Sequence, residues 1–150
     1  MKGCAVVGLG TGDRADDAVG VVVAERVRER DAAGVTVVPV ATPLELLEVF
    51  DAYDVVVVVD AVRSGSDAGA VTVSVVGEDA LPTRSPAAGT HGLGLAEVVE
   101  LARVLERLPA RLVVVGVELA DVTTGAGLTE AVDRAVDVAA AEVLRVAGVR

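Results

Sequence analysis

Apolar stretches recur at short intervals along the chain, and polar or glycine-containing segments separate them. Some stretches are runs of valine and other apolar residues, which is the pattern of strands covered by helices on both faces. Others repeat apolar residues every three or four positions, as amphipathic helices do. The runs predict strands at residues 4–10, 35–40, 54–62, 69–76 and 110–119, and the periodic segments predict helices at residues 18–31, 44–51, 93–108 and 128–148.

This alternation of strands and helices predicts an α/β fold. We expect a three-layer α/β/α sandwich, with a mostly parallel, twisted sheet of about five strands and helices on both faces. A chain of 150 residues has the length of one ordinary domain, so a single domain over residues 1–150 is expected. Thr42 followed by Pro43 is typical of a helix start, with threonine at the N-cap and proline at the first helical position.

Composition excludes several classes of partner. The formal net charge is -10, which would repel nucleic acid, and Phe50 and Tyr53 are the only aromatic residues that could stack on bases. No apolar run approaches the roughly 20 residues that span a bilayer, and the N-terminal segment is predicted to be a strand rather than a signal peptide. We therefore expect a cytoplasmic protein that binds neither nucleic acid nor membrane. Cys4 is the sole cysteine, which excludes an intrachain disulfide, and it is most simply a small buried apolar residue.

Polar side chains follow the predicted strands where those strands end. Asp13, Asp16 and Asp17 come after the first strand, and Asp60 closes the valine run of the third. His91, the only histidine, precedes the third long helix. Open parallel sheets bind ligands at the carboxyl ends of their strands, and neighbouring strands lie only about 4.8 Å apart. Groups that leave adjacent strands can therefore converge on one ligand.

Two other kinds of site fit the sequence less well. Gly8, Gly10 and Gly12 superficially resemble a dinucleotide-binding loop, but aspartates follow them where a pyrophosphate would have to bind. No serine lies in a G-x-S-x-G turn, and nothing singles out a serine partner for the one histidine. Nucleotide binding and serine-dependent hydrolysis are both disfavoured.

Asp17, Asp60 and His91 together suit a metal site. Two carboxylates and one imidazole leave coordination positions open for water or substrate, as in catalytic metal sites. Each residue also has an ordinary structural interpretation: Asp17 as a helix cap, Asp60 as a cap of the turn after its strand, and His91 as a loop residue. Their joint placement at one edge of the predicted sheet favours the metal site.

The same segments resemble the hydrogenase maturation proteases, which process the large subunits of [NiFe]-hydrogenases. The matching features are a D-[DE]-x-x-G turn at residues 16–20, Asp60 at the end of an apolar strand, His91 ahead of Gly-Leu, and Gly-Leu-Thr at residues 127–129. The resemblance extends over nearly the whole chain, from residue 4 to about residue 145. It implies the α/β sandwich already predicted.

The resemblance also implies an activity. Members of the family are endopeptidases, described as aspartyl-type or metal-dependent, that remove a C-terminal extension from the large-subunit precursor once nickel is in place. The residues that match the nickel-recognising and catalytic positions are Asp17, Asp60 and His91, with Asp16 as a neighbour of the ligands. The nickel belongs to the substrate, and zinc or cadmium can take its place. A divalent ion there can polarise the scissile carbonyl or lower the pKa of a water molecule.

The sequence departs from the family pattern in two places. Thr11 stands where the family usually has asparagine, and residues 40–47 lack the usual Gly-Thr stretch. That second region helps to accept the substrate tail in the family, so the departure bears on which hydrogenase is served. A different interpretation stays open from the sequence: a non-catalytic, metal-dependent binding module or chaperone that docks a hydrogenase-related partner.

Overall fold

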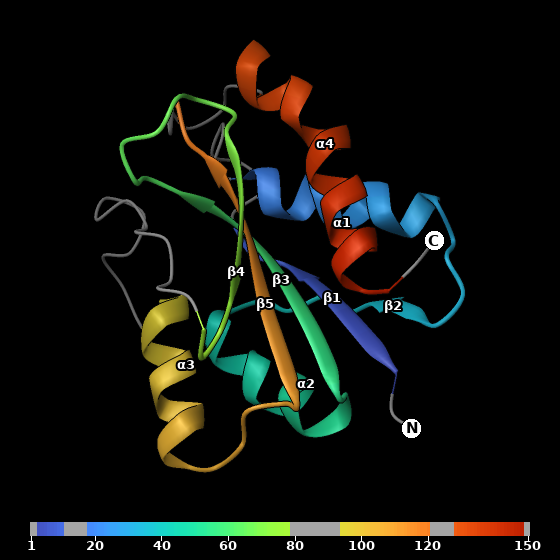
Figure 1. The fold of residues 1–150 in the computed structure, drawn as a ribbon, viewed down its shortest axis with the longest axis vertical. Coiled ribbons are helices and arrows are strands. Elements are labelled where there is room, and N and C mark those ends of the chain that lie inside the picture. The colour runs from blue at the N-terminus through green and yellow to red at the C-terminus, as the bar shows by residue number, and fades with distance from the viewer. Residues whose placement is uncertain (1–2, 11–17, 79–93, 121–127, 149–150) are drawn as a thin grey trace.

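The computed structural model describes residues 3–10, 18–78, 94–120 and 128–148. Within these residues one sheet lies between two layers of helices, as Figure 1 shows. Its strands are β1 (Cys4–Gly8), β2 (Val35–Val37), β3 (Val55–Val62), β4 (Val71–Val75) and β5 (Arg111–Glu118). The α-helices are α1 (Val19–Glu29), α2 (Leu46–Ala52), α3 (Leu95–Val104) and α4 (Glu130–Val146), and a short 3-10 helix, Pro43–Glu45, leads into α2.

The sheet has the strand order β2-β1-β3-β5-β4. The first four of these strands are parallel, and β4 runs antiparallel to β5 at one side. The carboxyl ends of β1, β3 and β5 therefore meet at one edge, where the first residues of β4 also lie. The predicted three-layer α/β sandwich with a mostly parallel sheet is confirmed.

Two apolar cores cover the two faces of the sheet. Helices α1 and α4 pack on one face, and α2 and α3 pack on the other (Figure 1). Strand β3 serves both cores, because Val57 and Val59 face α1 and α4 while Val56 and Val58 face α2 and α3. All four valines are fully buried, and burial of one such side chain contributes roughly 1.5–3 kcal/mol relative to exposure. This double burial explains why the run is continuous rather than alternating.

Strand β2 and helix α3 end before the residues that the hydrophobic pattern predicts, because local backbone conformation ends them. Strand β2 ends at Val37 rather than at residue 40, because Pro39 has no N–H to donate to a ladder. Helix α3 ends at Val104 rather than at residue 108, and Glu106 adopts the left-handed conformation with φ 57°. At the start of the 3-10 helix, Thr42 is the predicted N-cap, and its backbone N–H donates to the Glu45 carboxylate at 2.9 Å.

The first and last helices pack side by side on the sheet. Arg26 of α1 and Arg30, the C-cap residue of that helix, both bind the carboxylate of Asp137 in α4, the second at 3.2 Å. These pairs are largely exposed, so each contributes less than about 1 kcal/mol. The apolar contacts of α1 and α4 with the sheet do most to hold this layer. No helix among the described residues is long and apolar enough to cross a membrane.

Candidate active site at the carboxyl edge of the sheet

Two glycines bring the start of α1 against the ends of β1 and β3. A Cβ atom on Gly8 would lie 2.1 Å from the Gly20 carbonyl oxygen. A Cβ atom on Gly20 would lie 2.2 Å from the Leu9 carbonyl oxygen and 2.5 Å from that of Val59. Such distances are far inside normal contact, so only glycine permits this approach. The first turn of α1 is thereby held beside Val59, the residue that precedes Asp60.

Asp60 lies near the end of β3 and is 2% exposed. The alternation of β3 directs its side chain to the face that α2 and α3 cover, the same face as Val56 and Val58. Burial of an ionised carboxyl group is costly unless other groups compensate for it, so a buried acid at a strand end is a candidate for a functional group. The structure thus places this predicted residue at the edge where ligands of such sheets bind.

The other predicted site residues lie outside the described part of the chain. These are Asp16, Asp17 and His91, and also Asp13, which precedes them in the first loop. No group of three His, Cys, Asp or Glu side chains that could hold a metal occurs among the residues that the structure describes. The gathering of Asp17 and His91 around Asp60 therefore stays a prediction.

Glu118 is a second buried acid at this edge, and it was not among the site residues predicted from the sequence. It ends β5, is 2% exposed, and its carboxylate accepts hydrogen bonds from the Ser64 hydroxyl at 2.6 Å and the Ser64 N–H at 2.9 Å. The Gly65 N–H adds a third bond at 3.3 Å. Glu118 therefore fixes the loop that leaves β3 just after Asp60. The signal was present, because Glu118 closes an apolar strand much as Asp60 does.

Asp60, Gly116 and Thr72 form one row across three strands. Asp60 of β3 is opposite Gly116 of β5, and Gly116 is opposite Thr72 of β4. A Cβ atom on Gly116 would lie 2.9 Å from Thr72 Oγ1 and 3.1 Å from Cγ1 of Val62. The absence of a side chain on Gly116 therefore leaves room for the threonine hydroxyl to lean over β5.

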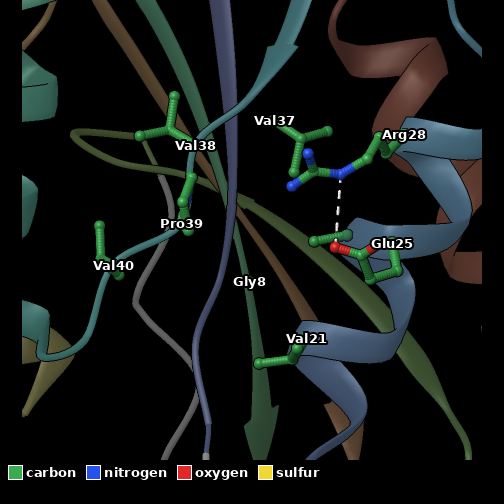
Figure 2. Close-up of a pocket in the computed structure, with 9 residues that line it drawn as sticks. Gly8, Val21, Glu25, Arg28, Val37, Val38, Pro39 and Val40 are labelled. Atoms are coloured by element: carbon green, nitrogen blue, oxygen red, sulfur yellow. Dashed lines mark ion pairs between the residues drawn. The ribbon is translucent and has the colours of Figure 1, made fainter.

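A small pocket opens at the ends of β1 and β2, further along the same edge. Its volume is about 90 Å³, and Figure 2 shows Val21 of α1 opposite Val38, Pro39 and Val40, which follow β2. Glu25 and Arg28 of α1 form an ion pair of 3.3 Å at its margin. The wall after β2 is mainly apolar, and it leads into residues 40–47, which depart from the family pattern.

A family model described as hydrogenase maturation protease matches residues 21–146, which is most of the chain. This chain belongs to that family. It is accordingly a hydrogenase maturation endopeptidase. No curated protein matches the sequence significantly.

Solved structures of such endopeptidases share the fold of this protease. It is similar to an endopeptidase from Escherichia coli, with 27% identity, a TM-score of 0.78, and coverage of 98% of this chain and 94% of that one. The hydrogenase maturating endopeptidase HybD from E. coli is 24% identical, with a TM-score of 0.73 and coverage of 95% and 90%. The [NiFe] hydrogenase maturation protease HycI from Thermococcus kodakarensis is also 24% identical, with a TM-score of 0.73 and coverage of 98% and 93%.

The single cysteine of the protease is an unsuitable nucleophile. Cys4 is 6% exposed in β1, and burial raises the pKa of its thiol above the ordinary value of 9.0. The thiolate is the reactive form, and it is scarce in such an environment at neutral pH. Cys4 behaves as the small buried apolar residue that the sequence predicted.

Proposed function

We propose that this maturation protease removes a C-terminal extension from the large-subunit precursor of a [NiFe]-hydrogenase after nickel has been inserted. The observation that carries the proposal is the position of Asp60. It is a buried carboxylate at the ligand-binding edge of the sheet, in a chain that belongs to the maturation proteases. The resemblance of the sequence to that family supplies the substrate.

Asp17, Asp60 and His91 are the residues that we propose recognise the nickel of the precursor, with Asp16 beside them. Carboxylate oxygens and imidazole nitrogens are suitable ligands for divalent ions of this kind. The described neighbours of these residues support the proposal. Ala18, next to Asp17 in sequence, is buried, and Gly20 holds the following turn against Val59. His91 is three residues ahead of Gly94, the N-cap of α3.

The chain contributes binding and orientation to the reaction. Bound nickel, as part of the substrate, would supply positive charge that polarises the scissile carbonyl or lowers the pKa of a water molecule. The ligands would hold the precursor tail in a fixed position against the strand ends, which converts an encounter between separate molecules into a reaction within one complex. Cleavage would then depend on nickel insertion, so that only finished precursors are cut.

The test compares variants on nickel-loaded and nickel-free precursor, with the mass of the large subunit as the readout. We expect Asp17→Ala and His91→Ala to keep the circular dichroism spectrum of the wild type and to lose processing of the nickel-loaded precursor. Asp13→Ala is the matched control, because it removes an acid from the same loop without removing a proposed ligand. It should process normally.

Three results would contradict the proposal. Full activity of Asp17→Ala or His91→Ala would refute the ligand assignment. Equal cleavage of nickel-free precursor would refute the dependence on nickel. An unchanged precursor mass with a stable wild-type complex would favour the non-catalytic binding module instead.

A further inference from the structure

The pocket at the ends of β1 and β2 is lined by apolar side chains that remain accessible. Val21 of α1 is 36% exposed, and Val38 and Val40, which follow β2, are half-buried. Figure 2 shows Val21 on one side of the pocket and Val38, Pro39 and Val40 on the other. A concave site with an accessible apolar lining is a candidate for the binding of a ligand.

The lining of the pocket suits an uncharged occupant. Among the described residues that line it, only Glu25 and Arg28 are charged, and they are paired with each other at 3.3 Å. A charged group in the pocket would therefore lose water without gaining an unpaired partner of opposite sign, which is unfavourable. The volume of about 90 Å³ lies between the roughly 30 Å³ of one water molecule and the roughly 150 Å³ of a cavity that holds benzene. A branched aliphatic side chain, such as that of valine or leucine, fits this space.

The pocket lies close to Asp60 across the strand ends. Gly8, which ends β1 and lines the pocket, is opposite Val59, the residue before Asp60. The pocket is on the α1 side of the sheet, whereas the Asp60 side chain faces α2 and α3. A polypeptide that reaches both must therefore cross the carboxyl ends of β3 and β1. Two strand spacings are roughly 10 Å, which about three residues of extended chain can span.

A backbone group at the rim of the pocket is available to such a polypeptide. The N–H of Val38 donates to β1, and the N–H of Ala41 donates to the Glu45 carboxylate at 2.9 Å. Between them, the N–H of Val40 bonds to no other described residue. Main-chain hydrogen bonds hold many bound peptides in an extended form while pockets select their side chains. The rim and the pocket together offer both kinds of contact.

We propose that this pocket is a specificity site, which binds one branched aliphatic side chain of the precursor about three residues from the scissile bond. The role in cleavage rests on the proposed function, whereas the preference for an aliphatic side chain stands on the lining of the pocket. An endopeptidase has to bind an extended segment of its polypeptide substrate, and this chain belongs to a family of such enzymes. The precursor is therefore the occupant that matches the pocket.

The first test varies the precursor. Nickel-loaded precursors with leucine, tryptophan, lysine or aspartate at each position within about four residues of the scissile bond are compared by kcat/KM. We expect one position at which leucine is cleaved at least about tenfold better than lysine or aspartate, because an unpaired charge is costly to bury. Tryptophan there should also be cleaved more slowly than leucine, because the indole exceeds the volume of the pocket. Equal rates for all four residues at every position would overturn the proposal.

The second test varies the wall of the pocket. Val21→Asp adds a carboxylate in the first turn of α1, where a helix tolerates an acid. It should raise the KM of the leucine precursor at least about tenfold and leave kcat nearly unchanged, because the lost contact is one of binding alone. It should also cleave the lysine precursor better than the leucine precursor, which reverses the wild-type order. An unchanged order of preference would refute the contact between Val21 and the precursor.

Val138→Asp is the matched control for the second test. It adds the same charge to another exposed valine, which belongs to α4 and does not line the pocket. Its KM and its order of preference should equal those of the wild type. A reversed order in this control would mean that the added charge acts at a distance, and it would overturn the assignment of the pocket.

The third test requires neither nickel nor cleavage. A synthetic peptide that spans the cleavage point, with leucine or aspartate at the selected position, is titrated into metal-free wild-type protein and followed by NMR. We expect the leucine peptide to shift the methyl resonances of Val21 and Val38 and the amide resonance of Val40, and the aspartate peptide to shift none of them. Absence of these shifts would overturn the specificity site, whether or not the precursor is cleaved. Shifts without cleavage of the nickel-loaded precursor would refute the proposed function and leave the specificity site supported.

Discussion

Gly20→Ala tests whether the close approach of α1 to the strand ends holds the site together. The added methyl group would lie 2.2 Å from the carbonyl oxygen of Leu9 and 2.5 Å from that of Val59. Both obstacles are backbone atoms of the sheet region, so neither can rotate away as a flexible side chain would. Helix α1 must shift outward to accommodate the methyl group.

The magnitude follows from two opposing effects. Replacement of glycine by alanine inside a helix normally stabilises by about 1 kcal/mol. Overpacking of a tight interface costs typically about 1–3 kcal/mol, and contacts with rigid backbone belong at the upper end. We therefore expect a net loss of about 2 kcal/mol, which lowers the melting temperature of a domain of this size by roughly 4–8 °C.

Urea and thermal unfolding, followed by circular dichroism, measure this loss. Val21→Ala is the control in the same turn, because Val21 is 36% exposed and its truncation should change the unfolding free energy by less than about 0.5 kcal/mol. The Gly20→Ala protein should also process precursor more slowly, since the start of α1 moves away from Asp60. A melting temperature at or above that of the wild type would refute the steric argument.

Two further predictions concern buried ionisable groups. Glu118→Gln should destabilise the protein by about 2 kcal/mol, because the amide has no charge and the NH2 group that replaces one carboxylate oxygen cannot accept the hydrogen bonds of that oxygen. Hydrogen exchange at the Ser64 and Gly65 amides should therefore quicken, and unchanged exchange would contradict the role of Glu118 in fixing the loop. For Cys4, the raised pKa means that the unfolded chain releases the thiol proton near pH 9.0 while the folded chain keeps it. The stabilisation is therefore complete below that pH and is lost as pH rises toward the pKa of the folded state. Above pH 9.0 the wild type should lose unfolding free energy relative to Cys4→Ala. Parallel curves of unfolding free energy against pH for the two proteins would contradict this.

The sequence indicates the layers of this fold well and the path of β4 less well. Continuous valine runs and helical periodicity predicted the strands and helices of the described chain. A strand buried on both faces is apolar at every position, and a helix buried on one face is apolar at every third or fourth position. The antiparallel direction of β4 is less evident in the sequence. Residues 63–70, between β3 and β4, are too few for the crossover that a parallel pair requires, but only the structure shows that β4 pairs with β5.

Some residues of the candidate site could likewise be predicted from the sequence, and others could not. Asp60 could be predicted, because an acid that closes an apolar run is visible in a single sequence. Glu118 follows the same rule and could have been found with it. Gly116 and Thr72 could not, because their relation to Asp60 is a cross-strand register, and register between strands distant in sequence is a property of the folded sheet.

The two apolar cores differ in how much of the polypeptide they need. Among the residues that the structure describes, the core under α2 and α3 uses none beyond Val114, whereas the other core includes Val132, Ala139 and Val143 of the last helix. A nascent chain leaving the ribosome can therefore cover one face of its sheet well before the other. A chain that ends before residue 130 would lack α4 and would expose valines on that face of the sheet. Exposed apolar surfaces of this kind cause aggregation and attract chaperones.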